Sequence, residues 1–462
     1  MAAEGAAVPG ERVGCEALAG VRPKVSGKFY GQPGSNRQGP HNRLKRPIPP
    51  GGNLQMAARV LLGRFLLRIN RGLAAILPAH FGIDFITFAV NILFPLLATK
   101  LDLNFTQVGI AAGLHIAANG LSQPLFGLLG DRIGSRRLLA GGIFVQGLFI
   151  GLAAQAPTYW LLLAFLLVSA LASGAFHALG LEAANRSSTT GKGSAVGLFF
   201  LAGNTGFAVS PVVTGFFVES ADLGLSFPLY LIGFSALTTS WFLLLTRGGR
   251  RRSASARPSD AAPPTGGVLY RLLAPLAAMS VFRGLTFGAA PVFVPFAFLE
   301  SGASLTIAGL ALSVFSAGAA TGVFGGGWLS DRLGAKAVMA LPLLLGTPLF
   351  MLMVVDIGSP LSFVAAYMVG FTVQTPQTPS VVMVQQAMAS RMGAASGLAL
   401  GFIFSIQAVG QAATGVLADE FGLQLALVAI GFMPVLGFFC TLAVPGPMLE
   451  RNPWAKSAAV TP

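Results

Sequence analysis

Long apolar stretches dominate the chain from about residue 73 onward. They reach about 18 residues or more, which is the length that an α-helix needs to cross a bilayer. Short segments rich in glycine, proline and charge separate them. The pattern predicts twelve membrane-spanning helices, over residues 73–98, 107–129, 138–155, 159–181, 194–218, 226–246, 271–299, 305–329, 337–355, 360–388, 394–418 and 423–446.

Composition and charge support a membrane protein. Of 462 residues, 54% are hydrophobic and only 10% are charged, whereas a soluble domain carries about 25% charged residues. The net charge of +14 does not indicate nucleic-acid binding, because the cations lie in the N-terminal tail and in alternate short loops. This positive-inside pattern predicts a multi-pass protein of the plasma (inner) membrane with both termini in the cytoplasm.

The polar segments divide the chain into parts. A tail rich in glycine, proline and arginine precedes the first helix and is predicted to be disordered. Met56 reads like a natural start, so the tail is alternatively an over-extended gene prediction. The expected order is a basic tail over 1–71, a six-helix bundle over 72–246, a cytoplasmic linker over 247–270, a second six-helix bundle over 271–446 and a cytoplasmic tail over 447–462.

The second half of the chain repeats the first at a constant offset of 200 residues. The offset holds over about 120 residues and predicts two homologous halves in parallel orientation, related by an axis along the membrane normal. Matching pairs include Thr106 and Thr306, Gly109 and Gly309, Gly127 and Gly327, Asp131 and Asp331, Arg132 and Arg332, Gly134 and Gly334, and Gly215 and Gly415.

A charged loop, GLLGDRIGSRR (127–137), follows the second predicted helix and recurs in the second half. A carboxylate at a helix end can accept charge-assisted hydrogen bonds or cap a neighbouring helix. We therefore expect a cytoplasmic gate that latches the halves in the outward-open state; alternatively, these charges only set the topology. The candidate gate residues are Gly127, Asp131, Arg132, Gly134, Arg136, Arg137, Asp331 and Arg332.

Polar stripes run along several predicted helices. Ionisable groups at membrane depth are costly and therefore mark functional sites by default. Asp84 is the one carboxylate clearly within a span, so we expect it to load and release protons as a coupling group, with His80 one turn away and His177 assisting. The further candidates for a substrate cavity are Asn91, His115, Asn119, Gln123, Asn204, Arg283, Gln377 and Gln407.

Simpler roles remain open for some of these residues. His115 and the glutamines are alternatively hydrogen-bond partners between helices. Arg283 either pairs with Asp84, binds an anionic substrate or extends to the membrane interface.

The loop motif G-x-x-x-D-R-x-G-x-R-R resembles that of the major facilitator superfamily. The resemblance covers roughly residues 72–446. Within that superfamily the chain is similar to fosmidomycin-resistance-type transporters. The matching positions are His80 and Asp84, Pro95, Gln123-Pro124, Phe176-His177 and Gly203-Asn204, with Ala178 where that group has proline. The resemblance implies an all-α membrane protein of twelve helices in two pseudo-symmetric six-helix bundles, working by alternating access.

The sequence thus predicts a secondary transporter for a small organic molecule. Proton-coupled efflux of a fosmidomycin-like or other organic anion is the main hypothesis. An uptake permease or uniporter is the first alternative, and a non-transporting membrane sensor is the second. No nucleophile–base pair, metal-ligand cluster or phosphate loop is seen, so neither an enzyme nor a cofactor or metal is expected. The expected partners are the substrate, protons and lipid, with a monomeric chain and no nucleic acid.

Overall fold

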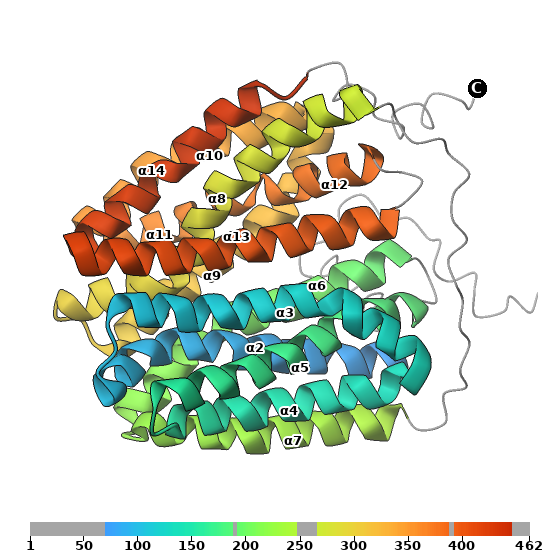
Figure 1. Cartoon of the computed structure of the whole chain (residues 1–462), viewed down its shortest axis with the longest axis vertical. Helices are drawn as coiled ribbons and strands as arrows, with labels where there is room; N and C mark the ends of the chain where they lie inside the picture. Colours follow the sequence, from blue (N-terminus) through green and yellow to red (C-terminus); the bar gives the residue numbers. More distant parts are fainter. Residues whose placement is uncertain (1–69, 188–191, 247–265, 388–391, 446–462) are drawn as a thin grey trace, which may run out of the picture. The chain divides into compact units, whose positions relative to one another are not determined.

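The computed structural model describes residues 70–187, 192–246, 266–387 and 392–445, which are almost entirely helical and include no strand (Figure 1). The chain divides into Met1–Arg64, which lies outside these ranges, and Phe65–Pro462, which contains every described helix. The predicted C-terminal tail therefore lies outside the described residues, as do the N-terminal tail apart from Asn70 and Arg71 and most of the predicted linker.

Each half of the chain contributes one set of antiparallel helices. The first set is α2 (Arg71–Leu101), α3 (Phe105–Ile133), α4 (Ser135–Gln155), α5 (Tyr159–Arg186), α6 (Lys192–Gly215) with the π-helical turn η2 (Phe216–Ser220), the 3-10 turn η3 (Gly224–Ser226) and α7 (Phe227–Leu245). The second set is α8 (Gly266–Glu300), α9 (Leu305–Leu333), α10 (Ala335–Val355), α11 (Pro360–Gln374), α12 (Gln377–Ala387), α13 (Met392–Phe421) and α14 (Leu423–Leu442).

Ten helices in the described part are long and apolar enough to cross a membrane. The other two predicted spans correspond to α3, and to α11 with α12. Helix α3 has 29 residues, and it is not among those ten because His115, Asn119 and Gln123 interrupt its apolar stretch. The predicted span over 360–388 contains two helices, because the chain breaks at Thr375-Pro376, where proline lacks an N–H and disfavours a helical residue before it.

Matching caps set equivalent helix ends in the two halves. The side chains of Asn104 and Ser304 accept hydrogen bonds from the backbone at the starts of α3 and α9. Gly134 and Gly334 end the same two helices with φ angles of 96° and 83°, a conformation that glycine adopts without steric cost. Each pair is separated by 200 residues, so the sequence repeat is also a repeat of local structure.

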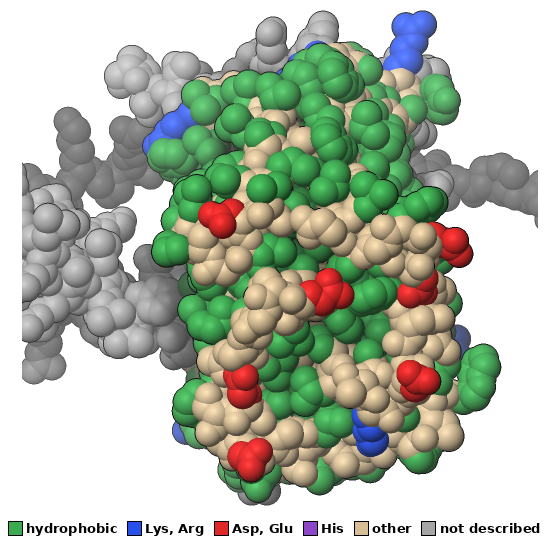
Figure 2. All heavy atoms as spheres, turned by 90° about the vertical axis from the view of Figure 1, so that its left-hand side faces the viewer, with side chains coloured by type: hydrophobic (Ala, Val, Ile, Leu, Met, Phe, Trp, Pro, Cys, Tyr) green, Lys and Arg blue, Asp and Glu red, His purple; other side chains and the backbone are tan. Residues whose placement is uncertain are grey.

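The two ends of the helix set differ in charge. We call the end where α2 meets α3 the acidic end, and the end where α3 meets α4 the basic end. Figure 2 shows acidic side chains gathered on the acidic end. Its charged residues are Lys100, Asp102, Glu219, Asp222, Glu300, Asp356, Asp419 and Glu420. At the basic end the described cations include Arg71, Arg132, Arg136, Arg137, Arg186, Arg271, Arg332 and Lys336.

The buried apolar core is shared at the acidic end and divided at the basic end. One cluster joins both halves, with side chains such as Phe94 and Phe293, and occupies the acidic-end part of the helices. Two separate clusters fill the basic-end part, one around Ile76 and Phe176 in the first half and one around Met279 and Met339 in the second. Among the described residues, the halves therefore share a core at the acidic end only.

Glycines explain where the halves touch. The largest contacts between halves are α3 with α13 and α6 with α9. A side chain at Gly109 or Gly309 would collide with the backbone of the opposite half, so only glycine permits this approach. Toward the basic end, Gly127 and Gly197 have open space beside them. The described structure is thus closed at the acidic end.

Candidate functional site

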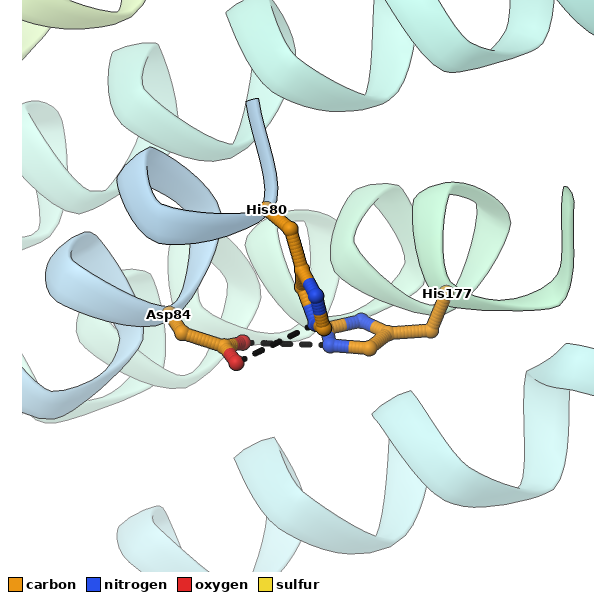
Figure 3. Close-up of side chains that lie close together, drawn as sticks. All are labelled: His80, Asp84 and His177. Carbon is orange, nitrogen blue, oxygen red and sulfur yellow. Dashed lines mark hydrogen bonds and ion pairs between the residues drawn. The ribbon is translucent and has the colours of Figure 1, made fainter. Parts of the chain in front are cut away.

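A buried carboxylate contacts two histidines in the first half (Figure 3). Asp84 and His80 are one turn apart on α2, and His80 Nε2 lies 3.2 Å from Asp84 Oδ2. His177 comes from α5, and its Nε2 lies 3.1 Å from Asp84 Oδ1. The side chains of His80 and Asp84 are 3% and 4% exposed, whereas that of His177 is 20% exposed. Any ligand therefore reaches this cluster past His177.

Hydrogen bonds on the far side of each ring fix the protonation pattern. His80 Nδ1 lies 2.7 Å from the Phe199 carbonyl, and His177 Nδ1 lies 2.9 Å from the Ser173 carbonyl. A carbonyl oxygen only accepts, so both Nδ1 atoms must carry hydrogen and donate. Each Nε2 of a neutral ring would then turn a lone pair toward the carboxylate. The two Nε2–oxygen contacts are favourable only when a proton lies in them.

Helix α6 supplies the wall of this cluster. The ring of His80 stacks on Phe199, with centroids 3.7 Å apart. A Cβ atom on Gly203 would collide with the Asp84 carboxylate and with His80. Glycine at this position therefore lets α6 cover the cluster directly, which excludes water and lipid from Asp84.

A chain of hydrogen bonds links the cluster to the polar stripe of α3. Asn119 donates to Ser173 Oγ at 3.1 Å, and Ser173 Oγ lies 3.3 Å from His177 Nδ1. Gln123 extends the chain by donating to Asn119 Oδ1 at 3.4 Å. The structure thus brings together five residues from three predicted helices: His80 and Asp84, Asn119 and Gln123, and His177.

The three donor atoms of His80, Asp84 and His177 lie within 4.8 Å of one another, so a metal ion is chemically conceivable. The contacts, however, form two separate pairs, in which each nitrogen faces its own carboxylate oxygen at hydrogen-bond length. This geometry suits protons on individual contacts better than one shared metal centre.

A second polar cluster lies at the corresponding place in the other half. Arg283 on α8 is fully buried. Its Nη1 donates to Gln374 Oε1, and lies 3.4 Å from Gln377 Oε1. Among the described residues, no partner is found for its Nε and Nη2. At the 200-residue offset Gln377 corresponds to His177, so the two clusters occupy equivalent positions.

Two alternatives for Arg283 are wrong in this structure. Within the described residues it makes no ion pair with Asp84, whose partners are the two histidines. It also does not extend to the membrane interface, because its side chain is fully buried. A buried guanidinium without a carboxylate partner is costly unless a ligand or water satisfies it.

The other candidate residues lie outside the two clusters. Buried His115 is 3.5 Å from Ser169 of a neighbouring helix, and Gln407 is buried. Asn91 is partly exposed, and Asn204 donates to the Phe200 carbonyl of its own helix.

The loop residues at the basic end bind within their own halves. Arg136 donates to the Leu243 carbonyl and to Thr246 Oγ1 at the end of α7. Arg332 lies over the ring of Trp328, 3.5 Å from its centroid. Asp331 is exposed, and the side chain of Asp131 lies outside the described part. A latch between the halves is therefore not seen in the described contacts of this loop.

Sequence reasoning missed one contributor to these clusters and the pairing of another. The Phe199 carbonyl orients His80, but a backbone atom leaves no mark in the sequence. Gln374 holds Arg283; it was visible as a polar residue in an apolar stretch, but its partner was not.

An all-helical membrane fold with two pseudo-symmetric halves and buried polar clusters at equivalent positions is that of a transporter. The family description Major Facilitator Superfamily matches residues 76–406 and 276–460. The chain belongs to the major facilitator superfamily, and its role is transport rather than enzymatic catalysis.

Two curated relatives are similar along most of the chain. The uncharacterised MFS-type transporter YfnC of Bacillus subtilis (strain 168) is 26% identical over 386 residues, covering 81% of this chain and 90% of the relative. The fosmidomycin resistance protein of Escherichia coli (strain K12) is 24% identical over 394 residues, covering 81% of this chain and 92% of the relative.

Solved structures show the same fold. An inward-facing, unoccupied bacterial homologue of the human lysosomal transporter Spinster aligns with a TM-score of 0.67 and 15% identity, over 81% of this chain and 97% of its own. The nucleoside transporter NupG, in a mutant form, aligns with a TM-score of 0.65 and 15% identity, over 82% of this chain and all of its own.

Proposed function

We propose that this transporter exports a small organic anion in exchange for protons by alternating access. The observation that carries the proposal is the His80–Asp84–His177 cluster. Both Nδ1 atoms donate to backbone carbonyls, so each Nε2–carboxylate contact is where a proton can be taken up and released. Asp84 is the coupling residue. Protons reach it past His177, because His177 is the most exposed side chain of the cluster.

The C-terminal cluster supports an anionic substrate. Arg283 keeps Nη1 on Gln374 and leaves the Nε–Nη2 edge without a partner among the described residues. That edge presents two parallel N–H donors, which match both oxygens of a carboxylate, phosphate or phosphonate. A fosmidomycin resistance protein among the relatives is consistent with such a substrate.

The state of the structure supports alternating access. We propose that the basic end faces the cytoplasm, following the positive-inside rule, and that the protein resides in the plasma (inner) membrane as a monomer. The divided core at the basic end then leaves the halves separated on the cytoplasmic side. Rocking of the halves would close this end and engage the loop around Asp331 and Arg332 as a gate.

The experiment is substrate-triggered proton movement in proteoliposomes under an imposed pH gradient. Fosmidomycin and then a panel of small organic anions are added to wild type, to Asp84→Asn and to the control His115→Gln. We expect proton release in wild type and in the control, and none in Asp84→Asn. Transport that is indifferent to both the gradient and Asp84→Asn would contradict coupling and favour a uniporter. If no anion in the panel is transported, neutral compounds are tested next, and transport of a neutral compound would contradict the proposal of an anionic substrate.

The two parts of the proposal fail separately. Proton release with neutral compounds only would support Asp84 as the coupling residue and contradict an anionic substrate. Anion transport without proton release would support Arg283 as the anion-binding residue and contradict proton coupling.

A further inference from the structure

Two acidic side chains at the acidic end reach across from one half of the molecule to the other. Asp419 near the end of α13 accepts hydrogen bonds from the backbone N–H groups of Phe105 and Thr106, both at 2.8 Å. These groups are the first of α3, in the other half. A carboxylate of the second half therefore caps a helix of the first.

The reciprocal contact is made by Glu219 in η2. It accepts from the backbone N–H groups of Leu305 at 3.2 Å and Thr306 at 2.8 Å, and from Thr306 Oγ1 at 2.7 Å. These groups begin α9 in the second half. Every member of this contact is offset by 200 residues from its counterpart, since Glu219 matches Asp419 and Leu305 and Thr306 match Phe105 and Thr106.

Glycine brings each acid within reach. Gly215 and Gly415 lie one turn before the acids, and a Cβ atom on either would collide with the backbone at the start of the capped helix. The turn that carries Glu219 is π-helical, a distortion that is frequent at functional positions within helices. The closeness of the helices and the capping carboxylates are thus parts of one arrangement, present twice.

We propose that Glu219 and Asp419 form a paired clamp that holds the acidic end closed and must release each time the transporter opens there. Each carboxylate satisfies free N–H groups and interacts with the positive end of a helix dipole. Both contacts join the two halves, so separating the halves at this end breaks them together. This inference needs only the two-state motion of the fold and does not depend on proton coupling or on the substrate.

Spin-label distance measurements test the clamp directly. Labels are placed on the full chain at Thr99 and Ser301, one exposed position per half at the acidic end, after replacing Cys15 and Cys440 by serine. Glu219→Gln and Asp419→Asn keep side-chain size and remove the charge. We expect each to enlarge the long-distance population about threefold to tenfold relative to the short-distance one, and the double variant to approach the product.

The matched control is Glu420→Gln, which removes the same charge one residue away from Asp419. Among the described residues Glu420 makes no hydrogen bond across the halves, so we expect no change in the distances. A second check is Asp419→Glu, which retains the charge and should retain most of the closed state. The proposed clamp is contradicted if the double variant keeps the wild-type distances, or if Glu420→Gln shifts the distances by the same amount. Thermal melting of each variant identifies any that fails to fold. In that case the distances in Asp419→Glu test the clamp instead.

Discussion

At the scale of single residues, the site depends on which atoms of a side chain remain free. His80 and His177 each use Nδ1 for a backbone carbonyl, which leaves Nε2 for Asp84. Arg283 likewise uses Nη1 for Gln374 and leaves Nε and Nη2. The sequence supplied the residue types, but the hydrogen bonds of the folded chain decide which donors and acceptors remain for a ligand.

Gly203→Ala tests the packing around Asp84. The new Cβ atom would meet the Asp84 carboxylate and His80, so the cluster must shift. We expect proton release to fall at least tenfold, with a loss of stability of about 1–3 kcal/mol, typical of overpacking. The measurements are proton flux in proteoliposomes and thermal melting in detergent. Gly197→Ala is the control, because nothing lies near its Cβ position; equal loss in both variants would contradict the explanation.

Arg283→Lys tests the free guanidinium edge. Lysine keeps the positive charge but presents no parallel pair of donors. We therefore expect the apparent affinity for an anionic substrate to fall at least tenfold, while Arg283→Gln lowers it further. Substrate-concentration curves for transport provide the measurement. Retention of wild-type affinity in Arg283→Lys would show that charge alone suffices.

At the scale of helices, the polar stripe of α3 and the broken helix α11–α12 are the informative elements. The stripe was expected to face a substrate cavity, yet Asn119 bonds to Ser173 beside His177. The break at Thr375-Pro376 places Gln374 and Gln377 on either side of a bend, where both approach Arg283. In both cases a helix brings polar groups to a charged side chain that another helix carries.

Gly109→Val tests the contact between α3 and α13. A side chain at this position would collide with the backbone of Gln411, so the helices must separate at the acidic end. We expect a larger open population there, seen as longer distances between labels at Thr99 and Ser301. Gly141→Val should leave the distances unchanged, because nothing lies near its Cβ position. A shift in neither variant would mean that this contact does not control closure.

At the scale of the whole molecule, the halves behave as two bodies joined at the acidic end. The shared core, the glycine contacts and the two carboxylate caps all lie there, whereas the basic end has one core per half. Motion about this junction would expose the two polar clusters to alternate sides, as alternating access requires.

Separating the halves covalently tests this picture. A protease site inserted between Leu245 and Gly266 allows cleavage after assembly. We expect the two fragments to remain associated in detergent and to keep at least half of the transport rate, because α3–α13 and α6–α9 hold the halves together. Size-exclusion chromatography and flux assays measure both. Dissociation on cleavage would show that the connection between the halves is a main source of cohesion.

Fusions to a reporter that fluoresces only in the cytoplasm test the orientation. A fusion after Thr246 should fluoresce and one after Gln155 should not, because these positions lie at the basic and acidic ends. The reverse result would invert the proposed orientation and the direction assigned to transport.

The sequence by itself determined the class of this protein. Long apolar stretches cannot be buried in a small soluble domain, and a 200-residue repeat with a specific loop motif leaves few folds. It also identified Asp84, His80, His177 and Arg283 as costly groups at membrane depth, because that cost depends on residue type and position alone. The break at Thr375-Pro376 shows the limit of this approach, since apolarity continues across a helix end.

Only the tertiary structure decided which residues form hydrogen bonds and ion pairs with one another. The sequence allowed Arg283 to pair with Asp84, but packing placed the histidines there and left the arginine with glutamines. In the sequence, Glu219 and Asp419 directly follow two apolar stretches, whereas in the fold each caps a helix of the other half. Hydrogen bonds of this kind join residues 86 to 314 positions apart, and no local pattern encodes a partner at that distance.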